Sequence, residues 1–456
     1  HYIHSDLKQY LKESTSKQVD HIRFDNENPN HMFDSHSYAK GGRILHMLRY
    51  SIGDDAFFNG LEYYLTKYAN QAVEVHHLRL AMEHVSGQDL NWFFNQWFLA
   101  AGHPLISVEQ KIEDHKVSLT IKQNQSLETT PLYRVPLEIG IYENGVIKRF
   151  SIELNKQEEE FVFETSSLAD LVVFDADHYL LADISFDKTD EQWMYQLKNA
   201  PHYFDRMEAL DSLANSTNFA MQSTAVKMAL NDSFWAIKTQ GLEYFEKADP
   251  RTKGTLEGQL IILASTDVKS DVRTSAIYCL STYFDQDENA PGREHNKLYA
   301  KLVKDPSYIV AGEALRALQT VKPTQAYTLA KQELFTAKKE LKQTVLYTIA
   351  KNGNVADSDL IHSEFDKATG FETVGMTYNL INFLEKQKPS IYIESLLNIE
   401  SKIIGLEVWY QRYYTLQMLK EYTSENTDFN ASISKLYQNL IKVEKDQKVL
   451  MYLGVK

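Results

Sequence analysis

The chain has 456 residues, of which 43% are apolar and 12% aromatic, and its formal net charge is −14. This length predicts about three domains, and so large an apolar and aromatic fraction excludes a disordered protein. The acidic balance, without a cluster rich in Lys and Arg, argues against nucleic acid as a partner. No apolar run is long enough to cross a bilayer, so no membrane span is expected. The compartment stays open between the cytoplasm and the periplasm or exterior.

The chain starts at His1 rather than at a methionine. Ile3, Leu7, Tyr10 and Leu11 follow at helical spacing, so we expect the sequence to begin inside a helix. We therefore interpret it as a fragment whose upstream part is missing. Any targeting signal would lie in that missing part.

Residues 1–103 are predicted to form a helical domain. Gly53 and Gly87 are the expected ends of two helices, and the residues Asp54-Asp55 are expected to open the helix that follows Gly53. A fourth helix is expected from Leu90 to about Ala101, ending at Gly102-His103-Pro104, where proline forbids continuation.

In residues 104–187 the apolar period changes from 3.6 to 2, which is typical of strands. Alternating apolar residues occur in 117–121 and 135–141, and Asn144-Gly145 predicts a hairpin turn into the strand 146–154. Further strands are expected at 160–163, 171–174 and 179–181. This number of short strands in about eighty residues predicts a small β-sandwich.

Residues 188–456 are predicted to be helical to the end. Three segments share an acidic residue followed by small and large apolar residues; they begin at Asp232, Asp271 and Asp305. This pattern indicates a HEAT-like α-solenoid, in which stacked helix pairs share a core and leave a concave surface. Cys279 is expected to be a small buried hydrophobic residue rather than a reactive thiol.

Two motifs in the first domain carry a resemblance. The first is Ser37-Tyr38-Ala39-Lys40-Gly41-Gly42, and the second is Asn91-Trp92-Phe93-Phe94-Asn95-Gln96-Trp97 followed by Gly102-His103-Pro104. Together with the domain order, they make the chain resemble the C-terminal half of a gluzincin (family M1) zinc aminopeptidase of the aminopeptidase N and leukotriene A4 hydrolase type. The resemblance implies a multidomain, mainly α fold: the helical end of a thermolysin-like catalytic domain, a small β-sandwich and a HEAT-like repeat domain.

The resemblance also implies a role for Tyr38, as the hydrogen-bond donor to the oxyanion formed when zinc-activated water attacks a peptide carbonyl. A phenol suits this role because it is neutral at pH 7 and donates without adding charge. The other interpretation is that Tyr38 only packs beneath its helix. Ala39 stands where many relatives have Glu, which leaves the tyrosine unaffected.

The zinc motif His-Glu-x-x-His is absent from these residues. The resemblance therefore implies that Zn²⁺ is bound by a missing N-terminal half of the same protein, which would be a partner along with peptide substrates. We expect no metal ligand in this chain and expect the chain alone to be inactive. Six histidines precede residue 50, but they lack the spacing of a zinc site: His1, His4, His21, His31, His36 and His46.

Other residues of the two motifs are expected to be structural. Lys40 is expected to pair with a buried carboxylate, and Gly41 to permit close packing. His31 and His36 are expected in a polar loop near Tyr38, and the aromatic residues Trp92 to Trp97 in a core.

The alternative function is a non-catalytic scaffold, an aminopeptidase-like protein that binds protein partners through its helical repeats. The presence of Tyr38 favours the enzyme, because a scaffold has no need of that phenol.

Overall fold

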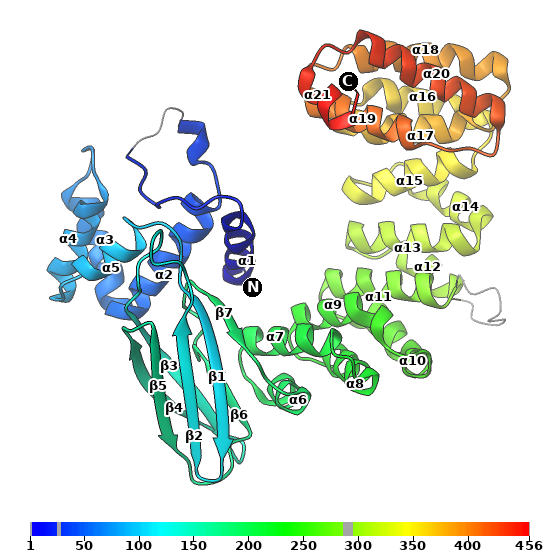
Figure 1. The fold of residues 1–456 in the computed structure, drawn as a ribbon. Helices are drawn as coiled ribbons and strands as arrows, with labels where there is room; N and C mark the ends of the chain where they lie inside the picture. The colour runs from blue at the N-terminus through cyan, green and yellow to red at the C-terminus, as the bar shows by residue number, and fades with distance from the viewer. Residues whose placement is uncertain (1, 25–28, 286–294, 456) are drawn as a thin grey trace. The chain divides into compact units, whose positions relative to one another are not determined.

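The computed structural model describes residues 2–24, 29–285 and 295–455. The described residues are mostly helical, with one region of strands, and the chain divides into two compact units, residues 1–249 and 250–456 (Figure 1). The predicted multidomain, mainly α fold is therefore confirmed. The domain boundaries after residues 103 and 187 stay a prediction. No helix in the described ranges is long and apolar enough to cross a membrane.

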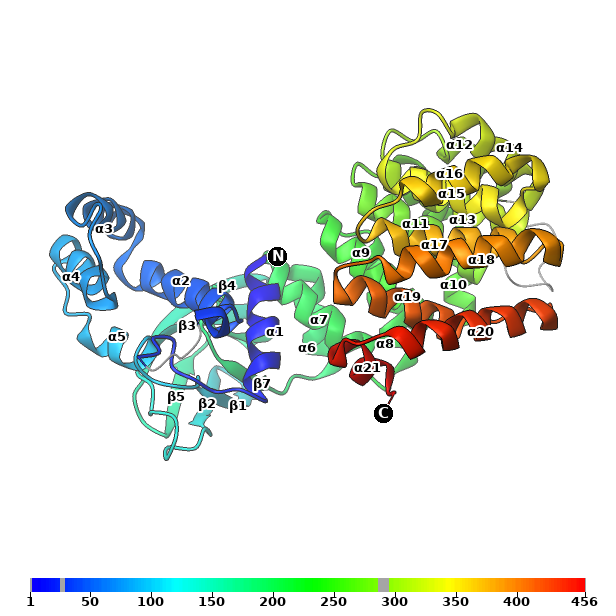
Figure 2. The same ribbon diagram turned by 90° about the horizontal axis from the view of Figure 1, so that it is seen from above.

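The first unit starts with helices, and the short turn that carries Tyr38 contacts α1 and α2. Figure 2 shows these two helices next to each other. Gly53 ends α2 with φ 83°, and Gly87 ends α4 with φ 70°, so both predicted stops are confirmed. The aromatic helix ends at Trp97, earlier than predicted, because the amides of Phe98 and Leu99 both reach the Phe94 carbonyl. The elements are α1 (Tyr2–Ser14), η1 (Pro29–Met32), η2 (His36–Lys40), α2 (Gly41–Ile52), α3 (Asp54–Lys67), α4 (Val75–Ser86) and α5 (Asn91–Trp97).

Two sheets follow, with strand orders β5-β2-β1-β7 and β4-β3-β6. Asn144 (φ 51°) and Gly145 (φ 80°) form the predicted hairpin turn, in which both central residues need positive φ. The strand expected at residues 179–181 is wrong: this segment is irregular and buried, and the last strand begins at Asp183. The strands are β1 (Leu105–Glu113), β2 (Lys116–Gln123), β3 (Val135–Glu143), β4 (Val146–Leu154), β5 (Glu158–Glu164), β6 (Leu171–Phe174) and β7 (Asp183–Phe186).

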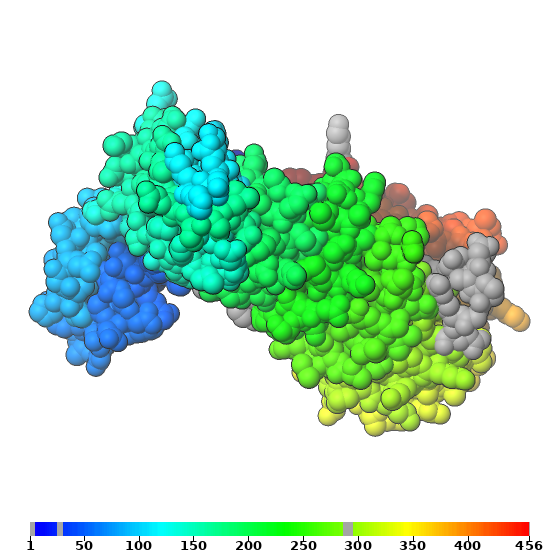
Figure 3. Space-filling view, turned by 90° about the horizontal axis from the view of Figure 1, so that it is seen from below, coloured from blue at the N-terminus to red at the C-terminus, as the bar shows by residue number. Residues whose placement is uncertain are grey.

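One hydrophobic core runs from the helices into the sandwich. Phe93, Phe94 and Trp97 are almost fully buried in it, together with Val117 and Leu119 of β2. Burial of each such side chain contributes about 1.5–3 kcal/mol. The aromatic helix is therefore a core element, as predicted. The strand ends farthest from α2–α5 reach the surface shown in Figure 3, where the sandwich is cyan to teal.

Four helices complete the first unit and pack around a second core that includes Leu210, Leu213 and Ile237. Their bounds, with one short 3-10 turn, are α6 (Asp190–Asn199), α7 (Tyr203–Ala214), α8 (Phe219–Leu230), α9 (Trp235–Glu243) and η3 (Tyr244–Lys247).

The second unit is a stack of helices in which α11, α13, α15, α17 and α19 pack against one another in succession. This succession of packed helices is what a solenoid of helical pairs requires. The elements are α10 (Pro250–Thr266), α11 (Ser270–Tyr283), α12 (Asn296–Leu302), α13 (Tyr308–Val321), α14 (Pro323–Glu333), α15 (Lys339–Asn352), η4 (Val355–Asp357), α16 (Ser358–Lys367), α17 (Glu372–Leu384), α18 (Pro389–Ile404), α19 (Trp409–Glu421), α20 (Thr427–Val443) and α21 (Gln447–Leu453).

A recurring ion pair explains the acidic residues of the sequence repeat. Arg206 pairs with Asp232 and Arg273 with Asp305, each at 2.8 Å and across 26 or 32 residues. Each carboxylate also accepts the amide two residues after it. In the middle copy of the repeat, the carboxylate that accepts the amide two residues after it is Asp267, which binds the Lys269 amide. The prediction that Asp271 corresponds to Asp232 and Asp305 is therefore wrong.

Candidate functional site

Tyr38 lies in a π-helical turn, His36–Lys40, that leads directly into α2. The turn is defined by a 2.8 Å hydrogen bond from the Lys40 amide to the Ser35 carbonyl. Such a turn holds one residue more than an α-helical turn, and π-turns occur frequently at functional sites. The sequence predicted a plain helix start here, and no residue pattern signalled the wider turn.

The Tyr38 side chain is exposed to solvent, with 65% of its surface accessible. Its neighbours Ala39 and Lys40 are buried, and so is His36. The ring of Phe33 lies 6.1 Å from the Tyr38 ring, centroid to centroid, in a tilted arrangement. The alternative that Tyr38 packs beneath its helix is wrong, because the turn points this phenol outward.

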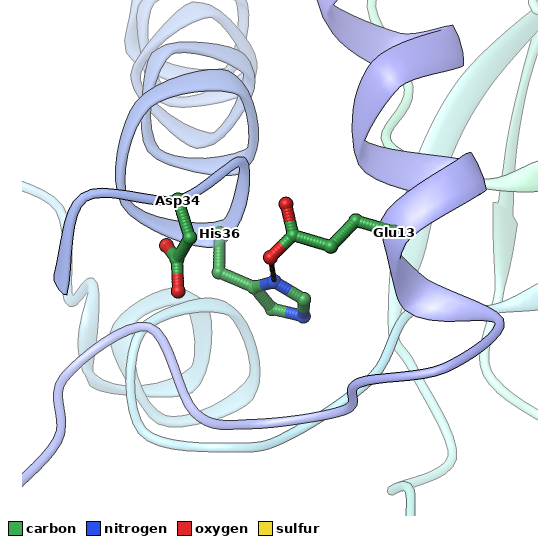
Figure 4. Close-up of side chains that lie close together, drawn as sticks. All are labelled: Glu13, Asp34 and His36. Carbon is green, nitrogen blue, oxygen red and sulfur yellow. Dashed lines mark hydrogen bonds and ion pairs between the residues drawn. The ribbon is translucent and has the colours of Figure 1, made fainter. Parts of the chain in front are cut away.

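Two carboxylates bind the backbone at the head of the turn. Glu13 of α1 accepts the Ser35 amide at 2.8 Å through Oε2, and its Oε1 lies 3.2 Å from Nδ1 of His36 (Figure 4). Asp34 accepts the Ser37 amide at 2.8 Å through Oδ1. The free amides that begin any helical turn are thus satisfied by side chains.

The two carboxylates are held in their ionised form. Burial raises the pKa of Asp34, but hydrogen bonds from Arg23 and Lys17 outweigh it and hold the pKa well below its usual range. For Glu13, burial is likewise outweighed by hydrogen bonds from Ser35 and His36, which lower its pKa.

His36 is fully buried in the turn and does not lie in a polar loop, so that expectation is wrong. Burial lowers the pKa of His36, against the opposing effect of Glu13. The neutral ring therefore donates its Nδ1 proton to Glu13, while the buried Nε2 has no hydrogen-bond partner among the residues that the structure describes. Part of the predicted loop falls on residues 25–28, which lie outside the described residues.

Lys40 joins the two sequence motifs. Its ammonium is fully buried and donates to the Gly102 carbonyl at 3.0 Å, and the Tyr10 hydroxyl reaches the same carbonyl at 3.2 Å. The prediction that Lys40 pairs with a buried carboxylate is wrong, because its ammonium donates to the Gly102 carbonyl instead. Burial lowers the Lys40 pKa to about 8, because a carbonyl compensates an ammonium less than a carboxylate does.

Gly41 makes room for a histidine ring. A Cβ on Gly41 would lie 2.6 Å from Cε1 of His21, a distance that real side chains do not show. His21 in turn donates from Nδ1 to the His36 carbonyl at 2.9 Å. The predicted role of Gly41 in close packing is confirmed, and its neighbour is this ring.

A zinc site does not fit these residues. Within the described ranges, the one group of three candidate ligands whose ligand atoms lie within 4.8 Å of one another is Glu13, Asp34 and His36. Both oxygens of Asp34 are engaged by Arg23, at 2.9 and 2.7 Å, and Lys17 binds the same carboxylate. Glu13 is engaged by the turn itself. The group is a hydrogen-bonded support for the backbone, with its charges already balanced.

Tyr38, Lys40 and Gly41 stand in a motif that the sequence displays, whereas Glu13 and Asp34 do not. Glu13 lies 22 residues from the amide it binds, and no motif marks it. Asp34 carried a weak signal, since an Asp three residues before an amide commonly caps a turn.

The comparisons with known proteins agree with one another on what this chain is similar to. Residues 1–97 match the model of the Peptidase family M1 domain. The chain is 35% identical to aminopeptidase N of Lactococcus lactis subsp. lactis over 112 residues, covering 24% of this chain and 13% of that protein. It is 23% identical to aminopeptidase N of Escherichia coli (strain K12) over 193 residues, covering 39% and 22%.

A solved structure shares the fold. The crystal structure of Legionella pneumophila aminopeptidase A in complex with aspartic acid matches with a TM-score of 0.56 at 12% identity, over 97% of this chain and 59% of that one. The segments aligned with the two aminopeptidase N proteins cover less than a quarter of the length of each of those proteins. The resemblance to M1 aminopeptidases predicted from the two motifs is confirmed.

Proposed function

We propose that this chain, whose first 97 residues match the Peptidase family M1 domain, is the C-terminal portion of a zinc-dependent aminopeptidase. Such an enzyme removes N-terminal residues from peptides. The chain supplies Tyr38 as a hydrogen-bond donor to the oxyanion. The observation that carries the proposal is an exposed phenol on a π-turn whose neighbouring residues and backbone are fixed.

The chemistry asked of Tyr38 is limited and suits its position. When water adds to a peptide carbonyl, the oxygen becomes negative, and a donor already in place stabilises it without reorganisation. Removal of one such donor typically lowers kcat about a hundred- to thousandfold.

Zinc belongs to this proposal but not to the described residues. M1 aminopeptidases are zinc enzymes, and Glu13, Asp34 and His36 do not fit the ion. We place the metal and the peptide amine site outside residues 1–456. The chain alone is accordingly inactive toward an amino-acid anilide, with or without added Zn²⁺.

The test is Tyr38→Phe in the intact protein that carries this chain. This change removes one hydroxyl and keeps the ring. We expect kcat for an aminoacyl anilide to fall about a hundred- to thousandfold while KM changes little.

The matched control is Tyr278→Phe, which removes a phenol of similar exposure (55%) from the other unit and leaves kcat unchanged. An unchanged kcat in Tyr38→Phe would remove Tyr38 from the mechanism. An intact protein without any peptidase activity would favour the scaffold instead.

A further inference from the structure

The π-turn that carries Tyr38 is supported from one side by α1. Glu13, in the last turn of that helix, contacts two consecutive residues of the segment, the Ser35 amide and the His36 ring. Figure 4 shows its carboxylate reaching across from α1 to the His36 imidazole. One side chain thus fixes both the backbone before the turn and the first ring within it.

This support matters because the same residues could also form an α-helical turn. An α-helical turn places successive side chains about 100° apart, and a change from π to α pairing removes one residue from the turn and rotates those before it. The Tyr38 phenol lies within the turn, so its direction depends on which pairing is present. Its ring has little packing of its own, being exposed.

The contacts of Glu13 favour the π pairing. The Ser35 amide is held by Glu13 while the Ser35 carbonyl accepts the Lys40 amide at 2.8 Å, so both backbone polar groups of Ser35 are committed. His36 is fully buried and is held through its Nδ1 by the same carboxylate. Loss of Glu13 leaves a buried imidazole and a backbone amide without these acceptors, which costs about 1–3 kcal/mol for each group.

We propose that Glu13 is a positioning residue for Tyr38: its carboxylate holds the π-turn and thereby the direction in which the phenol donates. The inference rests on the proposed function and adds a residue from a different helix to it. Glu13 does not touch the reacting atoms and acts through the turn.

The experiment is a double-mutant cycle in the intact protein, with Glu13→Ala and Tyr38→Phe alone and together. Misplacement of a catalytic group by about 1 Å lowers the rate about a hundredfold, so we expect Glu13→Ala to lower kcat about ten- to hundredfold with KM nearly unchanged. In the Tyr38→Phe background the same change should have less than a twofold effect, because the phenol it positions is absent. Glu62→Ala, at an exposed helical glutamate of α3, is the control and leaves kcat unchanged.

Equal losses from Glu13→Ala in both backgrounds overturn the inference, since a general loss of stability acts regardless of Tyr38. Failure of the proposed function looks different: Tyr38→Phe alone then has no effect.

A second measurement needs no activity and uses the 456-residue chain. Hydrogen exchange of residues 35–40 should accelerate at least tenfold in Glu13→Ala, while that of α3 is unchanged. If Glu13→Ala does not fold, Glu13→Gln serves in both experiments, since it keeps one acceptor and should show a smaller loss in the same direction. Unchanged exchange at residues 35–40 would also contradict the inference.

Discussion

Lys40→Met tests the buried ammonium that joins the two motifs. Lys40 is fully buried, and burial lowers its pKa from 10.5 to about 8. The gap of about 2.5 pH units, at about 1.36 kcal/mol per unit, corresponds to about 3 kcal/mol of lost folding free energy while the lysine is charged.

The sign follows from proton linkage. Between pH 8 and 10.5 the folded chain has released the Lys40 proton while the unfolded chain still binds it, so the free energy of unfolding rises with pH in this window. Methionine has a similar length and no charge, so it removes this dependence. It also removes the hydrogen bond to Gly102, worth about 1 kcal/mol, although the Tyr10 hydroxyl still reaches that carbonyl.

We therefore expect Lys40→Met to be more stable than the wild type by about 2 kcal/mol at pH 7 and to lose that advantage by pH 10.5. The assay is urea unfolding followed by tryptophan fluorescence at a series of pH values. The signal reports chiefly on the first unit, which contains Trp92, Trp97, Trp193 and Trp235, whereas the second contains Trp409.

The control for this experiment is Lys12→Met, at an exposed lysine of α1, which should run parallel to the wild type at every pH. Parallel curves for Lys40→Met and the wild type between pH 8 and 10.5 would refute the reasoning, because they would show that Lys40 is solvated like an ordinary lysine.

Three further predictions concern buried positions. His103 is buried, and burial lowers its pKa from 6.5 to about 4, so the free energy of unfolding should fall as the pH drops through this window. His103→Gln should remove about 3 kcal/mol of this loss, measured by urea unfolding at pH 4 and pH 7. Gly102→Ala should destabilise by about 1–3 kcal/mol in thermal unfolding, since φ is +83° and the new Cβ would lie 2.5 Å from Oγ1 of Thr130, whereas Gly42→Ala, with open space around it, should be neutral or stabilising. Cys279 is buried, which raises its pKa to about 12, so its reaction with an aromatic disulfide at pH 8 should be roughly a hundredfold slower in the native chain than in urea, and equal rates would contradict its burial.

Much of the fold could be read from local signals. Gly53, Gly87 and Asn144-Gly145 mark the ends of elements because each needs a positive φ, a property of the residue itself. The alternation of apolar and polar residues in β2 also predicted its buried face, because successive side chains of a strand point to opposite sides of the sheet. Residues 179–181 are apolar like a strand, but the segment is irregular, because its apolar residues serve burial and not strand pairing.

The order of helical and strand regions and the residue types of the motif, Tyr38, Lys40 and Gly41, follow from the amino-acid sequence. The contacts that hold the motif in place come from tertiary packing: Glu13 binds an amide 22 residues away at the head of the turn, and Lys40 donates to the Gly102 carbonyl, 62 residues away. Helical and strand periods are set by neighbours in the chain, so sequence reveals them. These two contacts join segments that meet only after α1 and α5 pack around one core, and no period in the sequence records such a meeting.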